Sequence, residues 1–520
     1  MARQERGPVL EARYDVIIIG AGIGGLTCGA ALAKAGKKVL ICEQYTQPGG
    51  YVTSFKRNGF TFDGGLQSFS SNGLVFPILK ELGLYDRVQF VHTDYQIITP
   101  DTRVKLNSLS QVKEEFKRVF PKAETEIEAY FQELDRLLIP FEKMFGGDKP
   151  ALPLLSGSQK ATALFSIPFT NLSFIRNLMR YQKTTSQDLI NRHLTDSKLR
   201  LIFASLGYPL MSAMTTVGMW YSFMKDYWYP IGGMQNFANL FTDLIGQNGG
   251  TISLRTRVDQ IMVEGGVAIG VKLADGREVR SKFVVSNIDW KQTFTKLIDR
   301  QYLEEEFVTQ IDKAEVSESA FCVYLGTDLD KRCFEGLAHH IAYFPAYSKS
   351  FLEKDTNDPN FFQDCSIGIT LPSLSDDSLA PQGKSVVVLT AFAPYDYLGK
   401  WKTKNGKRTE TYRKLKQEVA DQLIAIAEGV ILGLSQHITI RDIATPLTYE
   451  RCTLNSEGAT AGWSWDPRLT FTTKYSSSVG SLRTPIGNMF TCGHWCFSPG
   501  GVPTAMLTGR MVVDIIKNMS

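Results

Sequence analysis

The hydrophobic pattern begins with a short β-branched run at 14–19, followed by a glycine turn and an Ala/Leu-rich stretch that continues to Ala35. A second apolar run follows at 38–42. Short apolar runs bounded by turns predict strands, and the longer stretch between them predicts a helix. We therefore expect a strand–helix–strand unit with two parallel strands.

Further along, the apolar positions change their period several times. A helical pattern runs from about 100 to 224, and a later apolar helix is predicted at 237–245. Strands are then predicted at 251–254, 258–263, 267–273 and 283–285, with a hairpin turn at 274–277. The remainder gives strands at 320–325 and 386–392, an amphipathic helix near 410–434 and an apolar helix at 505–516.

One stretch, 201–224, has no charged residue. Its length alone would suit a transmembrane helix. Gly207 and Pro209 would break such a helix, and several Ser and Thr residues lower its hydrophobicity, so we reject a membrane span. We expect instead the buried wall of a lipid-sized cavity, with methionines such as Met211 and Met219 as adaptable lining.

Composition narrows the class of protein. The 520 residues include 57 Lys and Arg against 53 Asp and Glu, a net charge of +4, and 43% are hydrophobic. This is a globular composition with room for several domains, and it argues against a dedicated nucleic-acid binder. Eight scattered cysteines and a charged start without an apolar segment favour a reducing, cytoplasmic location.

The glycine turn carries the first chemical signal. Gly20, Gly22 and Gly25 fit the spacing G-x-G-x-x-G, which combines a tight turn, close approach of backbone to a pyrophosphate and close helix packing. Phosphate would then lie at the helix N-terminus. Glu43 ends the second strand, where a carboxylate would bind the hydroxyls of an unphosphorylated ribose, as in FAD or NAD.

A basic segment at 149–187 contains Lys and Arg among apolar residues but no Asp or Glu. Such a segment suits peripheral contact with an anionic membrane surface. A helix pair that packs its apolar face on the core explains the pattern equally well, because amphipathicity does not separate the two.

Several motifs together resemble the family of FAD-dependent phytoene desaturases and carotenoid isomerases, to which retinol saturase is also similar. The resemblance runs nearly from end to end. It rests on the segments at 20–26, 48–50, 59–63, 229–234, 444–448 and 493–503, which read GAGIGGL, PGG, GFTFD, YPIGGM, ATPLT and GHWCFSPGGVP.

The resemblance implies an α/β fold in which a Rossmann-like FAD-binding domain is assembled from discontinuous segments, with an inserted α+β substrate domain. The FAD-binding domain would comprise residues 1–100, 226–292 and 480–520. The substrate domain would comprise 101–225 and 293–479, including the helical region 149–187.

The resemblance also implies a set of FAD contacts from three parts of the chain. The expected residues are Gly20, Gly22, Ile23, Gly24, Gly25, Glu43, Gln44, Gly49, Gly50, Tyr51, Val258, Gly493, His494, Gly501, Val502 and Met506.

Two of these positions depart from the family pattern. Tyr51 stands where many relatives have Arg, which leaves a charge near the flavin in doubt and weakens an amine oxidase assignment. His494 stands where an acid is common, and its ring could still bind ribityl hydroxyls. Cys492, His494 and Cys496 lack the second cysteine pair of a structural zinc site, so no metal is expected.

The implied chemistry is hydride transfer from carbon to flavin with loss of a neighbouring proton, which forms a C=C bond in a long polyene or isoprenoid. Asp63 lies near the expected flavin, but an aspartate at a turn is more often structural, and the sequence identifies no catalytic residue. Only one dinucleotide fingerprint is present, so electrons should leave to a quinone, oxygen or a protein.

Three alternatives stay open. They are a redox-neutral cis/trans isomerase that uses reduced FAD, a saturase or desaturase of acyl lipids, and a lipid carrier that keeps FAD for structure. Product mass would separate the enzymes, and the protein could also form an oligomer.

Overall fold

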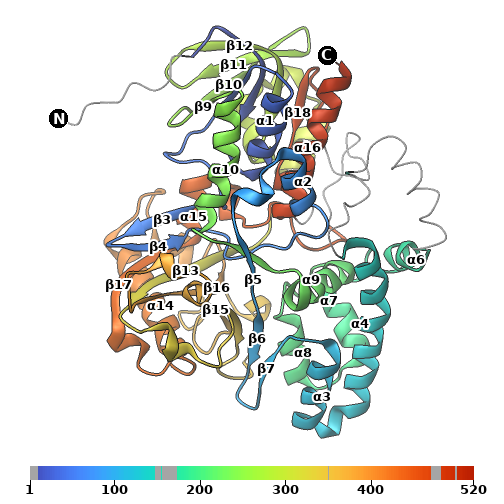
Figure 1. Cartoon of the computed structure of the whole chain (residues 1–520), viewed down its shortest axis with the longest axis vertical. Helices are drawn as coiled ribbons and strands as arrows, with labels where there is room; N and C mark the ends of the chain where they lie inside the picture. The colour runs from blue at the N-terminus through green and yellow to red at the C-terminus, as the bar shows by residue number, and fades with distance from the viewer. Residues whose placement is uncertain are drawn as a thin grey trace.

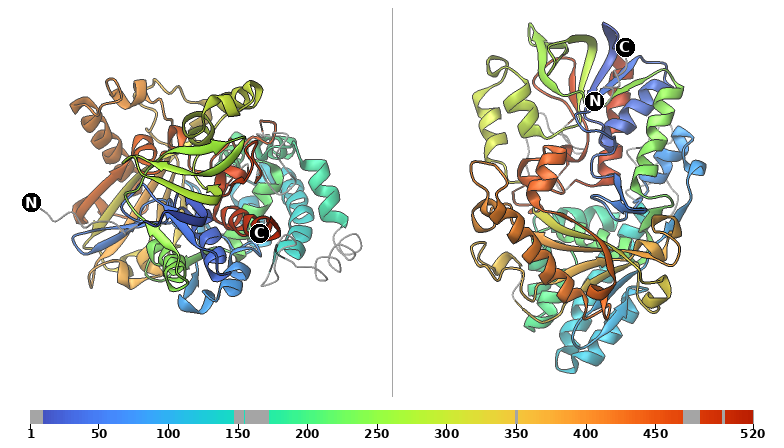
Figure 2. Two further views of the ribbon diagram at one scale, coloured as in Figure 1. Left: turned by 90° about the horizontal axis from the view of Figure 1, so that it is seen from above. Right: turned by 90° about the vertical axis from the view of Figure 1, so that its left-hand side faces the viewer.

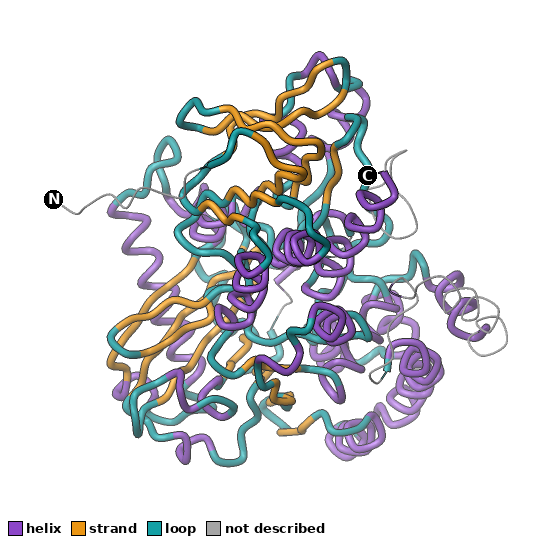
Figure 3. Tube along the Cα trace, turned by 45° about the horizontal axis from the view of Figure 1, so that its top comes forward, coloured by secondary structure: helices purple, strands orange, loops and turns teal. Residues whose placement is uncertain are grey.

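The computed structural model describes residues 10–146, 154, 172–348, 351–469, 482–497 and 500–519. These residues form two seven-stranded sheets and a separate lobe of helices. In Figure 1 the first sheet lies at the top, the second at the lower left and the helical lobe at the lower right. Figure 3 shows the strands gathered in these two groups.

The first sheet has a parallel core and an antiparallel edge. Strands β9, β2, β1, β12 and β18 pair in parallel, and β12 continues into the antiparallel strands β11 and β10. The strands are β1 (Arg13–Ile19), β2 (Val39–Cys42), β9 (Thr251–Ser253), β10 (Val258–Glu264), β11 (Val267–Leu273), β12 (Glu278–Ser286) and β18 (Met489–Thr491). Segments from the two ends and the middle of the chain therefore share one sheet, which confirms the discontinuous Rossmann-like domain.

Helices cover both faces of this sheet. On one face lie α1 (Ile23–Lys34), α10 (Met234–Gln247) and α16 (Val502–Met519), with α2 (Val75–Leu82) against α16. Figure 2 shows α16, red, beside α1, blue. The other face packs on α11 (Trp290–Gln292) and α12 (Glu305–Lys313). Apolar strands such as β2, which is buried throughout, are explained by this double covering.

The second sheet is mixed and mainly antiparallel. Its order is β17 (Ile438–Ala444), β13 (Ser319–Thr327), β16 (Ser385–Ala393), β15 (Ile367–Thr370), β14 (His340–Tyr343), β6 (Tyr95–Ile98) and β7 (Arg103–Lys105). The helix α14 (Glu410–Ala427) packs on it, and α13 (Leu398–Lys402) and α15 (Pro446–Thr453) flank it. Two antiparallel pairs lie between the sheets: the hairpin of β3 (Ser54–Arg57) with β4 (Phe60–Asp63), and β5 (Phe90–His92) with β8 (Trp228–Pro230), two strands far apart in the sequence.

The helical lobe has its own core. It consists of α3 (Leu109–Val119), α4 (Glu124–Phe145), α6 (Leu172–Tyr181), α7 (Ser186–His193), α8 (Ser197–Ala204) and α9 (Ala213–Lys225). The charge-free stretch is split between α8 and α9, as Gly207 and Pro209 predict. No helix among the described residues has the length and hydropathy needed to cross a membrane.

Three expectations need correction. The side chains of Met211 and Met219 both lie next to Gly207 in the helical lobe, and neither lines the main cavity. The expected domain boundaries also shift, because β6 joins the second sheet before residue 100 and α12 packs on the first sheet. The helix predicted to 434 ends at Ala427.

Candidate active site

The glycine turn after β1 is shaped so that only glycine fits at key positions. Gly20 has a φ of +93°, and a Cβ added at Gly24 would lie 2.7 Å from the Cα of Gly493. Gly49 donates its N–H to the carbonyl of Ala21 at 2.8 Å, which places the Pro-Gly-Gly segment beside the turn. The helix α1 then begins at Gly22 without any side-chain cap and without an acid in its first turn. Its first N–H groups are therefore available to an anion.

Glu43 lies directly beyond the end of β2. Its Oε2 accepts a hydrogen bond from the Ala21 N–H and its Oε1 accepts one from the Tyr45 N–H, both at 2.7 Å. Burial is the largest influence on this carboxyl and raises its pKa. Each oxygen keeps a second lone pair, so the carboxylate can still accept from ribose hydroxyls.

A cavity of about 670 Å³ runs from Glu43 past the glycine turn to the C-terminal segment. Fourteen of the sixteen expected FAD contacts line it: Gly20, Gly22, Ile23, Gly24, Glu43, Gln44, Gly49, Gly50, Tyr51, Val258, Gly493, His494, Gly501 and Val502. The other two lie behind its wall. A Cβ at Gly25 would sit 2.4 Å from the carbonyl oxygen of Gly20, so this glycine allows close packing of α1, and Met506 is fully buried in the core.

One end of the cavity is aromatic. The rings of Tyr51 and Tyr449 lie 5.8 Å apart, and those of Tyr51 and His494 lie 6.2 Å apart. Phe55 and Tyr324 also line this part, with their rings 5.1 Å apart and perpendicular. These side chains come from β3, β13, α15 and two loops. Residues on and beside the second sheet therefore complete the cavity wall that begins at the first sheet.

Polar atoms in this aromatic end are held neutral by burial. Burial lowers the pKa of His494 to about 4, so the ring is uncharged at pH 7, and its Nε2 has no partner among the described residues. Burial raises the pKa of Tyr51 to about 12, and its hydroxyl donates to the carbonyl of Ala459 at 2.8 Å. The Tyr324 hydroxyl donates to the carbonyl of Gly64 at 2.7 Å.

Asp63 does not line the cavity. It is buried and accepts hydrogen bonds from the Ser54 hydroxyl at 2.6 Å, the Tyr229 hydroxyl at 2.7 Å and the Met234 N–H at 2.8 Å. Its carboxylate therefore joins β3 and β4 to β8 and the start of α10. This arrangement supports a structural role for Asp63.

The cysteine-rich segment at 492–496 contains buried side chains. No cluster of three or more candidate metal ligands occurs in the part of the chain that the structure describes. All eight cysteines are unpaired thiols. Burial raises the pKa of Cys496 to about 12 and that of Cys492 well above its ordinary value, so neither is a thiolate at pH 7.

The sequence did not single out several residues of this site. Tyr324 and Tyr449 come from the second sheet and α15, and nothing local marks them as cavity residues. Asn287 had a usable signal, because it follows the carboxyl end of a buried parallel strand, where ligands bind in sheets of this kind.

The residues that line the cavity have the shape and chemistry that FAD requires. An uncapped helix N-terminus beside turns that exclude any Cβ suits a pyrophosphate, and Glu43 with Val258 suits an adenosine. The unpartnered Nε2 of His494 and the aromatic wall at the other end suit a flat, partly polar ring.

Relatives with known activities cover nearly the whole chain. A prolycopene isomerase of Daucus carota is 27% identical over 521 residues, which cover 96% of this chain and 79% of the relative. A 4,4′-diapophytoene desaturase of Methylomonas is also 27% identical, over 96% of this chain and 95% of its own length. An oxidoreductase of Methanosarcina mazei shares the fold with a TM-score of 0.61 at 16% identity, covering 96% of this chain and all of that one.

The family model described as flavin-containing amine oxidoreductase matches residues 23–517. This match begins at α1, just after β1 of the first sheet, runs through the inserted second sheet and helical lobe, and ends in α16. The chain therefore belongs to the flavin-containing amine oxidoreductase family and is an oxidoreductase that uses FAD.

Proposed function

We propose that this protein desaturates a long hydrophobic polyene or isoprenoid, in the manner of the phytoene desaturases. The observation that carries the proposal is the aromatic end of the cavity, formed by Tyr51, Phe55, Tyr324 and Tyr449. These side chains offer flat apolar faces with few unused polar atoms. A polyene gains from such contact and needs no hydrogen-bond partner.

The charged lining residues argue against an amine substrate. Among the described residues, the carboxylates that line the cavity are Glu43, Asp259 and Asp442. Glu43 receives two backbone N–H groups, while Asp259 and Asp442 pair with Arg257 at 2.8 Å and Arg57 at 3.2 Å. Asp259 and Asp442 already have arginine partners, and the remaining lone pairs of Glu43 are those proposed for the FAD ribose, so none of the three is left as a counter-ion for a substrate ammonium group.

Bound FAD supplies a two-electron acceptor that takes a hydride from carbon. The chain's own residues bind and orient the substrate against it and exclude water. Neutral His494 and protonated Tyr51 add no charge to this part of the wall, and the Arg57 guanidinium, 5.1 Å from the centroid of the Phe55 ring, is already paired with Asp442.

Product mass tests this proposal. Protein reconstituted with FAD is incubated with a C40 polyene in detergent and a quinone, and the products are separated by mass. We expect products lighter by two hydrogens and a slower reaction in the variant Tyr449→Ser. An amine that is turned over while every polyene is left unchanged would contradict the proposal.

A second candidate is a redox-neutral cis/trans isomerase of the same substrates. The prolycopene isomerase of Daucus carota is as similar to this chain as the desaturase of Methylomonas, at 27% identity for each. In this case reduced FAD is required, and the product keeps the mass of the substrate while its absorption spectrum and retention time change.

We also propose a quinone or oxygen as the electron acceptor. The proposal rests on the single dinucleotide fingerprint of the sequence. Reoxidation of the reduced flavin by a soluble quinone or by air, measured in a stopped-flow instrument, should be faster than one turnover. Reoxidation only by NAD⁺ or NADP⁺ would contradict it.

Peripheral membrane association is proposed as the route by which a water-insoluble substrate reaches the site. Most of the basic segment 149–187 lies outside the described residues, but its helix α6 is described. That helix exposes Leu172, Leu178 and Met179 at 63%, 46% and 69%, beside exposed Arg176 and Arg180. Exposed apolar residues next to cations suit an anionic interface.

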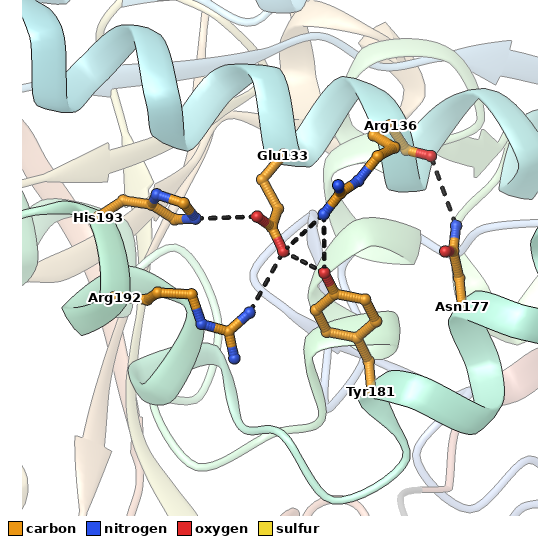
Figure 4. A network of polar contacts seen from close by, with 6 residues as sticks. All are labelled: Glu133, Arg136, Asn177, Tyr181, Arg192 and His193. Carbon is orange, nitrogen blue, oxygen red and sulfur yellow. Dashed lines mark hydrogen bonds and ion pairs between the residues drawn. The ribbon is translucent and has the colours of Figure 1, made fainter.

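An ion network holds α6 against the rest of the helical lobe (Figure 4). Glu133 of α4 accepts from the Tyr181 hydroxyl of α6, and it contacts His193 Nε2 at 3.0 Å and Arg192 at 3.3 Å from the α7 end. Arg136 lies 3.1 Å from the same carboxylate and donates to the Tyr181 hydroxyl at 3.0 Å. Three helices thus fix the orientation in which α6 presents its exposed residues.

Vesicle flotation tests the membrane proposal. The wild-type protein should float with vesicles of phosphatidylglycerol, and the double variant Leu172→Ser/Met179→Ser should float at least tenfold less, since each lost contact is worth about 1 kcal/mol. The control Leu432→Ser removes a leucine that is 87% exposed in the loop between α14 and β17, and this variant should float like the wild type. Equal flotation of the double variant and the wild type would refute a role of α6.

A further inference from the structure

Asn287 lies under the glycine turn, next to Ile288. It follows β12 directly and lines the cavity. Its backbone N–H donates to the carbonyl of Ile19 at 2.9 Å, and its side-chain Nδ2 donates to the carbonyl of Gly20 at 3.1 Å. The residue therefore extends the pairing of β1 and β12 into the turn that follows β1.

The same side chain explains why several glycines are required. An added Cβ would meet its Nδ2 at 3.0 Å from Gly22 and 2.9 Å from Gly25, and its Oδ1 at 2.7 Å from Gly24 and 2.4 Å from Gly493. These glycines come from two segments that are far apart in the sequence. One amide group is thus enclosed by the glycine turn, the start of α1 and the loop after β18.

The amide also has hydrogen-bonding capacity left over. Cys492 Sγ lies 3.6 Å from Oδ1 as a weak donor, and Gly20 takes one of the two Nδ2 protons. The second Nδ2 proton is left for another acceptor, and the Asn287 side chain lines the cavity next to the uncapped N-terminus of α1. An N–H at this place adds a donor to the backbone N–H groups that face an anion.

We propose that Asn287 is a cofactor-binding residue that sets the shape of the glycine turn and donates its second amide N–H to the pyrophosphate of FAD. The inference rests on FAD as the cofactor and not on the identity of the substrate. An aspartate of the same shape would lose both donors and place a negative charge beside two phosphates. Shape and charge can therefore be tested separately.

The test is FAD and ADP binding to apoprotein, measured by flavin fluorescence quenching and by competition. Asn287→Ala should raise the Kd for FAD about 10- to 100-fold, the range expected for a hydrogen bond to a charged group. Asn287→Asp should raise it further, and 0.5 M salt should shrink the difference between the two variants because it screens the repulsion. ADP, which carries the pyrophosphate without a flavin, should show the same order.

The control is Gln247→Glu at the exposed C-terminal end of α10, which adds a charge to the same domain at a residue that does not line the cavity and should bind FAD like the wild type. Apoprotein melting temperatures show whether each variant folds: the control should melt like the wild type, and the two Asn287 variants should fold with a lower melting temperature because each loses the hydrogen bond to the Gly20 carbonyl. Asn287→Asp and Asn287→Ala with a Kd within twofold of the wild type would overturn the proposal. An Asn287→Asp variant that binds as tightly as the wild type while only Asn287→Ala is weakened would show a packing role and overturn the proposed donor.

Because binding is measured without substrate, this result is independent of the proposed polyene chemistry. A protein that binds FAD through Asn287 but fails to desaturate polyenes would contradict the proposed function alone. A protein that desaturates polyenes with unchanged FAD binding in both variants would contradict the role of Asn287 alone.

Discussion

The carboxylate of Asp63 offers a direct choice between a catalytic base and a structural acceptor. Replacement by Ala leaves three buried donors, Ser54, Tyr229 and Met234, without an acceptor. At roughly 1–3 kcal/mol for each buried donor, the loss of stability should be about 4 kcal/mol. For a chain of 520 residues, with an unfolding entropy of about 2.1 cal/mol/K per residue, that corresponds to a fall in apparent Tm of about 4 °C.

Replacement of Asp63 by Asn keeps the shape of the side chain and should cost far less. The amide oxygen still accepts from Ser54 and from the Met234 N–H, and its NH₂ group can donate to the Tyr229 oxygen, so only the Tyr229 proton loses its acceptor. Burial raises the pKa of Asp63, which means that the native carboxylate carries a desolvation cost that Asn removes. The loss should be about 1 kcal/mol.

The assay combines thermal melting with turnover per bound flavin. Folded Asp63→Asn protein should turn over within threefold of the wild type, and Tyr229→Phe should lose about as much stability as Asp63→Asn. A well-folded Asp63→Asn variant with turnover reduced by about 10²–10⁴, the usual worth of a general base, would refute the structural reasoning.

The remaining predictions concern the cofactor site and the buried core. Glu43→Gln should raise the Kd for FAD about tenfold, measured by fluorescence titration, because an amide accepts one bond fewer from ribose; unchanged affinity would contradict this role. Gly24→Ala should abolish FAD binding, since its Cβ would lie 2.7 Å from Gly493 Cα, and a flavin-loaded variant would contradict the packing. Burial lowers the pKa of His339 to about 3, so the unfolded chain binds its proton first as pH falls below about 6.5. As the pH falls, the free energy of unfolding measured in urea should therefore decrease by up to about 1.4 kcal/mol per pH unit because of this residue. The variant His339→Gln should show a shallower decrease between pH 6 and 4, and equal slopes for the variant and the wild type would contradict this prediction.

The parallel unit at the start of the chain was predictable because local patterns specify it. Strand β1, helix α1 and strand β2 agree with the predicted runs, and the hairpin turn at 274–277 has Gly276 in the left-handed region with a φ of +87°. Here each segment's apolar period, its glycines and its partner strand all favour the same structure.

The aromatic end of the site was not predictable in the same way. Tyr324 lies in the middle of β13, a strand with both faces buried, so its sequence does not show which face meets the cavity. That is decided by the pairing of β13 with β16 and β17. Asp63 illustrates a related limit. Its partners Tyr229 and Met234 are more than 160 residues away, and a turn motif alone does not show that they meet.

The absence of charge and the adaptable methionine side chains of the stretch 201–224 predict a cavity wall. The structure packs Met211 fully buried beside Gly207 in the helical lobe, because the break between α8 and α9 folds this stretch back on itself. Hydrophobicity predicts burial, but it does not distinguish a packed core from the wall of a ligand cavity.

The most direct test of the central proposal is a single anaerobic turnover. Protein loaded with oxidised FAD is mixed with excess C40 polyene in detergent, the flavin absorbance near 450 nm is followed, and the products are analysed by mass spectrometry. The account predicts that the flavin bleaches and that one product molecule lighter by two hydrogens forms for each flavin reduced. Flavin that stays oxidised with every polyene offered, yet bleaches with an amine and releases an aldehyde, would contradict it.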